Sequence, residues 1–80
     1  MKEITTREEE VMRHFWSAGA LFVKQIVDMY PDPKPHFNTI STYVRSLEEK
    51  GYLNHEARGT TFRYFPGLRE EEYKKGNRGK

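Results

Sequence analysis

The hydrophobic pattern of the chain changes its period at Gly51, and this change constrains the fold more than any other feature. Before Gly51, apolar residues recur every three or four positions, as on one face of an amphipathic helix. Residues 52–65 instead form two short β-prone runs on either side of Arg58-Gly59, a pattern typical of a β-hairpin. The 80-residue chain therefore predicts one small domain, mainly α with a small β-hairpin.

Three helices are predicted before the hairpin, over residues 6–18, 22–30 and 37–50. The first begins with a capping box, in which Thr5 and Glu8 each bind a free backbone N–H of the first turn. A proline-rich loop, "PDPKP", separates the second helix from the third because proline restricts its neighbours and donates no hydrogen bond. The apolar faces consist of Val11, Met12, Phe15 and Trp16, then Val23, Ile26, Val27 and Tyr30, then Phe37, Ile40, Val44 and Leu47.

The sequence pattern leaves two short segments with alternative structures. The apolar stretch 20–22 either adds a brief strand or leads directly into the second helix. We expect the domain to span residues 1–69. The polar tail, residues 70–80, lacks an apolar face and is expected to be either disordered or the start of a further segment.

The order of helix, helix, helix and hairpin is that of a winged helix-turn-helix, in which the hairpin is the wing. This arrangement can place the third helix in the major groove of DNA. On that helix, Asn38, Thr42 and Arg45 lie nearly opposite the apolar face, with Ser41 beside them. Asparagine and arginine can read base edges, and serine and threonine can donate or accept hydrogen bonds there. These four side chains are therefore candidates for sequence reading, or else an ordinary solvated face.

The wing supplies a second group of candidates for DNA contact. Arg58 and Arg63 can contact phosphate or the minor groove, and Thr60 and Thr61 can hydrogen-bond to phosphate. Alternatively, the arginines only keep the wing soluble. Residues 33–69 hold six basic and three acidic side chains, so positive charge gathers in this half of a chain whose net charge is +2. That distribution permits contact with a polyanion.

Other chemistry finds little support in the sequence. The absence of cysteine excludes disulfides and thiol chemistry, and it suits a cytoplasmic protein. His14, His36 and His55 fall on three different elements without paired metal-ligand spacing, so no metal is predicted. No nucleophile–base pair or glycine-rich phosphate loop is present, so we expect neither an enzyme nor a cofactor. No apolar run approaches the length of a membrane span.

The remaining charged residues are interpreted as surface. Glu8 to Glu10 and Glu70 to Glu72 are expected to be solvated runs, and Lys34 and Lys50 are expected to be exposed lysines.

Four segments, in order, resemble those of a known family. They are "ITTREEEVMRHFW", "FVKQIV", "FNTISTYVRSLEEKGYL" and "ARGTTFRYFP". They are similar to the first helix, second helix, recognition helix and wing of the BlaI/MecI/CopY-type bacterial repressors, the penicillinase repressor family. The resemblance covers about residues 4–72. It implies an N-terminal winged-helix domain of a transcriptional repressor that binds double-stranded DNA, at a palindromic operator, as a homodimer.

The resemblance also carries site residues over by position. It implies that Asn38, Thr39, Ser41, Thr42 and Arg45 face the groove. Asn38 stands where the family more often has threonine, and Ser41 where it often has lysine, so the preferred bases do not carry over. Family members continue after the wing into a helical dimerisation segment. Without that segment, the sequence leaves open whether this chain is a monomer or a dimer.

A second function is compatible with the same fold. Winged helices also serve as protein–protein interaction modules that do not bind DNA, since fold does not determine function. The two functions differ in their response to salt. DNA binding through several phosphates weakens steeply as salt rises, whereas a partner held by apolar contacts responds much less.

Overall fold

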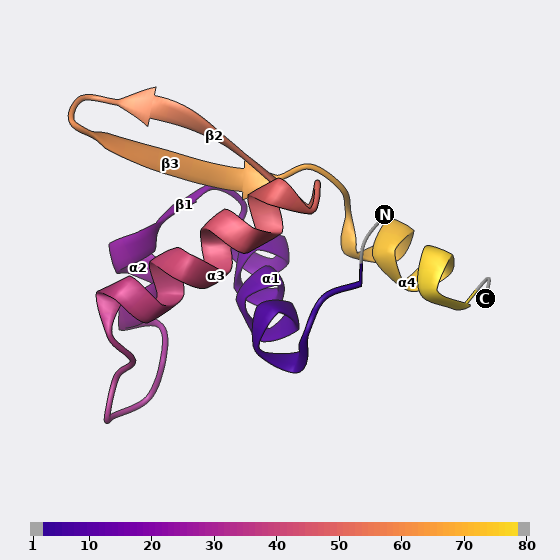
Figure 1. Ribbon diagram of the computed structural model, residues 1–80, viewed down its shortest axis with the longest axis horizontal. Coiled ribbons are helices and arrows are strands. Elements are labelled where there is room, and N and C mark those ends of the chain that lie inside the picture. Colours follow the sequence, from indigo (N-terminus) through magenta and orange to yellow (C-terminus); the bar gives the residue numbers. More distant parts are fainter. Residues whose placement is uncertain (1–2, 79–80) are drawn as a thin grey trace.

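The computed structural model describes residues 3–78, and helices and strands follow one another there in the predicted order (Figure 1). The strands form one antiparallel sheet in the order β1-β3-β2, and β2 and β3 are the two arms of a long hairpin. The winged helix-turn-helix predicted from the sequence is confirmed. The elements are α1 Thr6–Ala18, β1 Leu21–Phe22, α2 Val23–Asp28, α3 Phe37–Glu49, β2 Leu53–Arg58, β3 Thr61–Pro66 and α4 Glu70–Arg78.

The core lies where the apolar faces of α1, α2 and α3 meet the base of the sheet. The predicted helical faces supply most of it, and the sheet adds Leu21, Leu53 and Tyr64. Phe37 is the exception, because its side chain is 53% exposed. It is the first residue of α3, and it precedes the first buried residue of that helix, Ile40, by almost one turn. The prediction that Phe37 belongs to the core is therefore wrong.

The ends of α1 and α3 form as their sequences predict. At α1, Thr5 Oγ1 accepts from the Glu8 N–H at 3.1 Å, and a Glu8 carboxylate oxygen accepts from the Thr5 N–H at 2.8 Å. At α3, the Tyr52 N–H donates to the Leu47 carbonyl at 2.9 Å, which closes a Schellman motif around Gly51. Gly51 has φ 92°, a conformation that favours glycine. Helix α3 thus ends one residue before the predicted boundary.

The second helix is shorter at both ends than the predicted range 22–30. At its start, Phe22 is extended and belongs to strand β1, where it pairs with Arg63. The stretch 20–22 therefore adds a brief strand, which was one of the two alternatives. At its end, Tyr30 precedes Pro31, and the residue before a proline is disfavoured in the helical conformation.

The C-terminal tail is helical over the described residues. Tyr73 of α4 packs its ring against Trp16 and Tyr52, with ring centres 5.3 and 5.9 Å apart. The Trp16 indole N–H donates to the Leu68 carbonyl at 3.0 Å, which holds the segment before α4 against α1. The helix of the tail is α4, Glu70–Arg78, and the start of a further segment stays a prediction. Residues 79–80 lie outside the described residues.

Glu8 is buried, contrary to the expectation of a solvated carboxylate, and joins α1 to α3. Its side chain accepts from Lys50 Nζ at 2.8 Å and from Ser46 Oγ at 2.6 Å, in addition to the Thr5 N–H. Burial raises the pKa of Glu8, but the hydrogen bonds from Lys50, Ser46 and Thr5 lower it by more, so the net pKa lies below the ordinary 4.5. Lys50 is thereby a structural residue and not a free surface lysine.

Candidate nucleic-acid interface

The polar face of α3 points away from the core. Ile40, Val44 and Leu47 are buried on the opposite side of the helix. This orientation leaves the row of short polar side chains and Arg45 open to a ligand. The structure places the predicted reading residues as follows: Asn38, Thr39, Thr42 and Arg45 are exposed, and Ser41 is half-buried.

Thr39 differs from the other four residues in the side of α3 that it occupies. It precedes Ser46 by seven residues, or about two helical turns, so the two share one side. Ser46 contacts Glu8 of α1, so Thr39 lies toward the α1 side. Thr42 also has a local partner, because its hydroxyl donates to the Asn38 carbonyl at 2.9 Å. The Thr42 oxygen is left as an acceptor.

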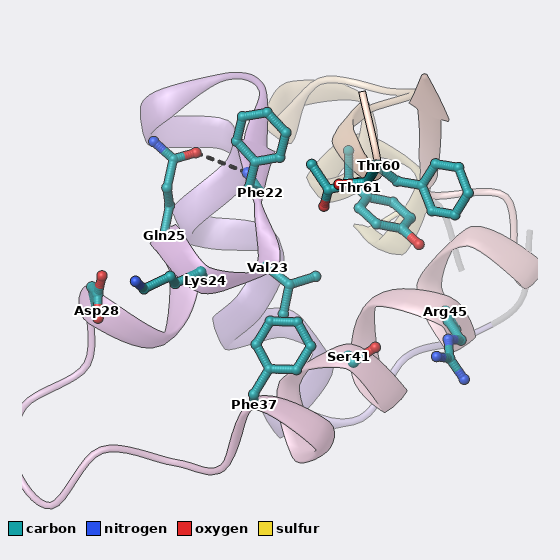
Figure 2. A pocket seen from close by; sticks show the side chains of 12 residues that line it. Phe22, Val23, Lys24, Gln25, Asp28, Phe37, Ser41, Arg45, Thr60 and Thr61 are labelled. Atoms are coloured by element: carbon teal, nitrogen blue, oxygen red, sulfur yellow. Dashed lines mark hydrogen bonds between the residues drawn. The ribbon is translucent and has the colours of Figure 1, made fainter. Parts of the chain in front are cut away.

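A groove of about 730 Å³ runs between α2, α3 and the wing (Figure 2). Ser41 and Arg45 line it from α3, and Thr60 and Thr61 line it from the wing. All four of these side chains were predicted from the sequence, and the fold brings them together. Three further polar residues line it from α2 and were not predicted: Lys24, Gln25 and Asp28. The sequence signal for Lys24 and Gln25 was their position in the first turn of the helix that precedes α3.

Apolar side chains form much of the rest of the groove. Val23 and Tyr64 are buried, whereas Phe37 and Phe62 are 53% and 51% exposed. Phe37 lies beside Val23 and Ser41 in the close view (Figure 2). The groove thus has both polar and aromatic walls.

The wing turns at Gly59-Thr60, between the paired residues Arg58 and Thr61. Gly59 has φ 63° and occupies the first central position, where type II′ turns take glycine. Because side chains alternate along a strand, Arg58 and Thr61 share one face of the hairpin with the cross-strand pair Glu56 and Arg63.

The other face of the hairpin contacts α3. The His55 ring packs against the rings of Phe62 and Tyr64, with ring centres 4.8 and 5.5 Å apart. His55 Nδ1 also contacts the Glu48 carboxylate of α3. Phe62 and Tyr64 are two positions apart on β3, so both side chains lie on this face of the hairpin. These contacts fix the position of the wing relative to α3.

Both arginines of the wing are paired with one carboxylate. Glu56 accepts from Arg63 Nε at 2.9 Å and also contacts the Arg63 terminal nitrogen, while a terminal nitrogen of Arg58 lies 3.4 Å away. The hydrogen bond from Arg63, aided by the charge of Arg58, lowers the pKa of Glu56. Arg58 is exposed and adjoins the turn, whereas Arg63 is half-buried in the sheet. Arg45, by contrast, has no ion pair among the described residues.

Within residues 3–78, no cluster of three or more histidine or acidic side chains has the arrangement to hold a metal ion. No helix in that range combines the length and the apolar character needed to cross a membrane.

Three helices, a wing fastened to the third of them and an exposed polar face define a winged-helix domain of the helix-turn-helix class. The family model described as penicillinase repressor matches residues 4–80. The chain belongs to the penicillinase repressor family.

One relative and two solved structures show the extent of the similarity. A 16.5 kDa protein encoded in the ptsI 3′ region of Latilactobacillus sakei is 39% identical over an alignment of 72 residues, and the match covers 88% of this chain and 49% of that protein. The chain thus spans about half the length of this relative. The DNA-binding domain of the repressor BlaI is 30% identical, with a TM-score of 0.74 over 91% of this chain and 94% of that one.

The second structure contains DNA. It is the monomeric form of Bacillus licheniformis BlaI in complex with the blaP half-operator, 29% identical to this chain. The TM-score is 0.71, and the match covers 90% of this chain and 89% of that one.

Proposed function

We propose that this chain is the sequence-specific DNA-binding domain of a transcriptional repressor, with α3 in the major groove and the wing on the phosphate backbone. One observation carries the proposal. The exposed polar face of α3 and the turn of the wing meet at a single groove, in a chain of the penicillinase repressor family. The similar protein BlaI, bound to its half-operator, supports DNA as the ligand.

The side chains of α3 take different roles in this proposal. Arg45 has an unpaired guanidinium and suits a bidentate contact with a guanine edge. Asn38 has the donor and acceptor that suit adenine, while Ser41 and Thr42 add hydrogen bonds at neighbouring bases. Thr39 lies toward α1, so we assign it to a phosphate or to the edge of the interface.

The wing and α2 then hold the backbone on either side of α3. Arg58, Thr60 and Thr61 are placed for phosphate contacts near the turn, and Lys24 and Gln25 approach from the start of α2. Arg63 is half-buried and bound to Glu56, so it contributes mainly through the position of the wing. We therefore assign Arg63 at most a phosphate contact at the edge of the interface.

We also propose how two copies of the domain assemble on DNA. A palindromic operator bound by a homodimer would place one domain on each half-site, in the cytoplasm where the chromosome lies. One domain on one half-site makes few contacts, so its binding should be weak. Linking two domains raises the effective concentration of the second.

An NMR titration of the isotope-labelled chain tests which surface of the domain contacts DNA. The titrant is a half-site duplex obtained by in vitro selection. We expect the largest amide shifts over residues 38–45 and 58–61, and small shifts in the part of α1 remote from the groove. Shifts confined to α1 and α4 would place the contact elsewhere. A chain that binds no duplex but captures a protein partner would favour the interaction module.

Glu56→Gln should strengthen DNA binding several-fold at low salt. The substitution removes the negative charge that holds Arg58 and Arg63, so both guanidiniums become available to phosphate. The slope of log affinity against log salt should steepen by about one for each added phosphate contact. Anisotropy titrations at three salt concentrations measure both effects. Glu10→Gln, which removes a surface charge on α1, is the matched control, and an equal gain in both variants would mean a general charge effect.

A further inference from the structure

An aromatic ring stands exposed at the first residue of α3. Phe37, Ser41 and Arg45 are spaced four residues apart, so they form one row along the helix. All three line the groove between α3 and the wing (Figure 2). A DNA edge that meets Arg45 and Ser41 therefore meets Phe37 about one turn earlier along α3.

Phe37 and Phe62 are the two exposed aromatic rings of the groove, and they differ in whether another ring packs against them. Phe62 packs its ring on His55, and this contact helps to fasten the wing to α3. Phe37 has no aromatic neighbour among the described residues. Its ring is thus available for a ligand, although a phenyl group cannot satisfy phosphate oxygens or polar base edges.

The major groove offers one apolar feature, the C5-methyl group of thymine. The N-terminal residues of a reading helix are the ones that contact base edges in helix-turn-helix proteins. We infer that Phe37 is a specificity-determining residue that reads a thymine through its methyl group. This inference rests on the proposed function and adds a base preference to it.

The spacing along α3 also places the thymine relative to the base read by Arg45. Eight residues of helix span roughly 12 Å at 1.5 Å per residue. Successive base pairs lie 3.4 Å apart along the axis, so the thymine belongs within about four base pairs of the guanine, a limit reached when α3 lies parallel to that axis. The half-site should therefore contain both bases within that distance.

A thymine-to-uracil scan of a selected half-site tests the inference because each change removes one methyl group and nothing else. With the wild-type chain, we expect one uracil position to weaken binding about four-fold, the loss for a single buried methyl. Phe37→Ala should bind the thymine and uracil duplexes equally. Phe37→Leu, which keeps an apolar side chain, should retain most of the preference for thymine.

Met29→Ala is the matched control because Met29 is also an exposed apolar side chain, 43% exposed, but does not line the groove. It should keep the wild-type preference, and thermal unfolding of each variant shows that it is folded. The inference is overturned if the wild-type chain binds but no thymine is sensitive. A loss at uracil that persists unchanged in Phe37→Ala also overturns it. Failure of the wild-type chain to bind any duplex overturns the proposed function as well.

Discussion

Glu8→Ala lowers the free energy of unfolding by about 3 kcal/mol, the scale for removing one partner of a buried ion pair. The Glu8 carboxylate is 4% exposed and accepts hydrogen bonds from Thr5, Ser46 and Lys50. Without it, the ammonium group of Lys50 and the hydroxyl of Ser46 lose their partner, and α1 loses half of its capping box. For a domain of this size, we expect the melting temperature to fall by roughly 10–20 °C.

The pH dependence of the same variant gives an independent test. The folded-state pKa of Glu8 lies below its ordinary value of 4.5, so Glu8 stabilises the fold fully above about pH 4.5. That stabilisation is lost as the pH falls through the folded-state pKa. The difference in unfolding free energy between wild type and Glu8→Ala should therefore narrow in acid.

Chemical denaturation at several pH values measures this difference. Glu10→Gln is the control because Glu10 forms only an exposed contact with Arg7, 3.9 Å apart, and its loss should cost little. Equal stability of Glu8→Ala and Glu10→Gln at neutral pH would show that the buried cluster contributes nothing.

Arg45→Ala weakens binding to the preferred DNA site by about 1–3 kcal/mol, the range for losing a bidentate contact with guanine. Arg45 is exposed, lines the groove and is free of ion pairs among the described residues, so its guanidinium needs no rearrangement before binding. Arg45→Lys keeps the charge but loses the planar fork of donors, so it should restore only part of the affinity. Anisotropy titrations with the selected site measure all three proteins.

The same titrations with a scrambled duplex separate base reading from phosphate contact. The Arg45→Ala loss should be much smaller there. Arg13→Ala is the control, since Arg13 is an exposed arginine of α1 paired with Glu9 and does not line the groove. Equal losses on the selected and scrambled duplexes would make Arg45 a phosphate contact and not a reader.

The elements of the fold were predictable because their signals are local. Helical spacing defined the buried faces, Thr5 and Glu8 defined the start of α1, and Gly51 defined the end of α3. Glu8 shows the limit of local signals. Its sequence neighbours indicated a solvated cap, whereas its burial depends on Ser46 and Lys50, which lie 38 and 42 residues away.

In the candidate site, too, some features were predictable from the sequence and others depended on the tertiary structure. Periodicity identified the exposed residues of α3, since a helix face follows from spacing alone. The pairing of Glu56 with Arg63 depends on the hairpin register, which alternation along the sequence left undefined. The exposure of Phe37 depends on how far α3 extends past its packed region, which is a tertiary property.

The central claim is that this chain reads DNA sequence through α3, and one titration tests it most directly. Fluorescence anisotropy would compare one palindromic duplex from in vitro selection with its scrambled counterpart, at low and moderate salt. We expect preferential binding to the selected duplex at both salt concentrations, with affinity for both duplexes falling as salt rises. Equal affinity for the two duplexes, or no binding to either even when two copies of the chain are linked, would contradict the claim.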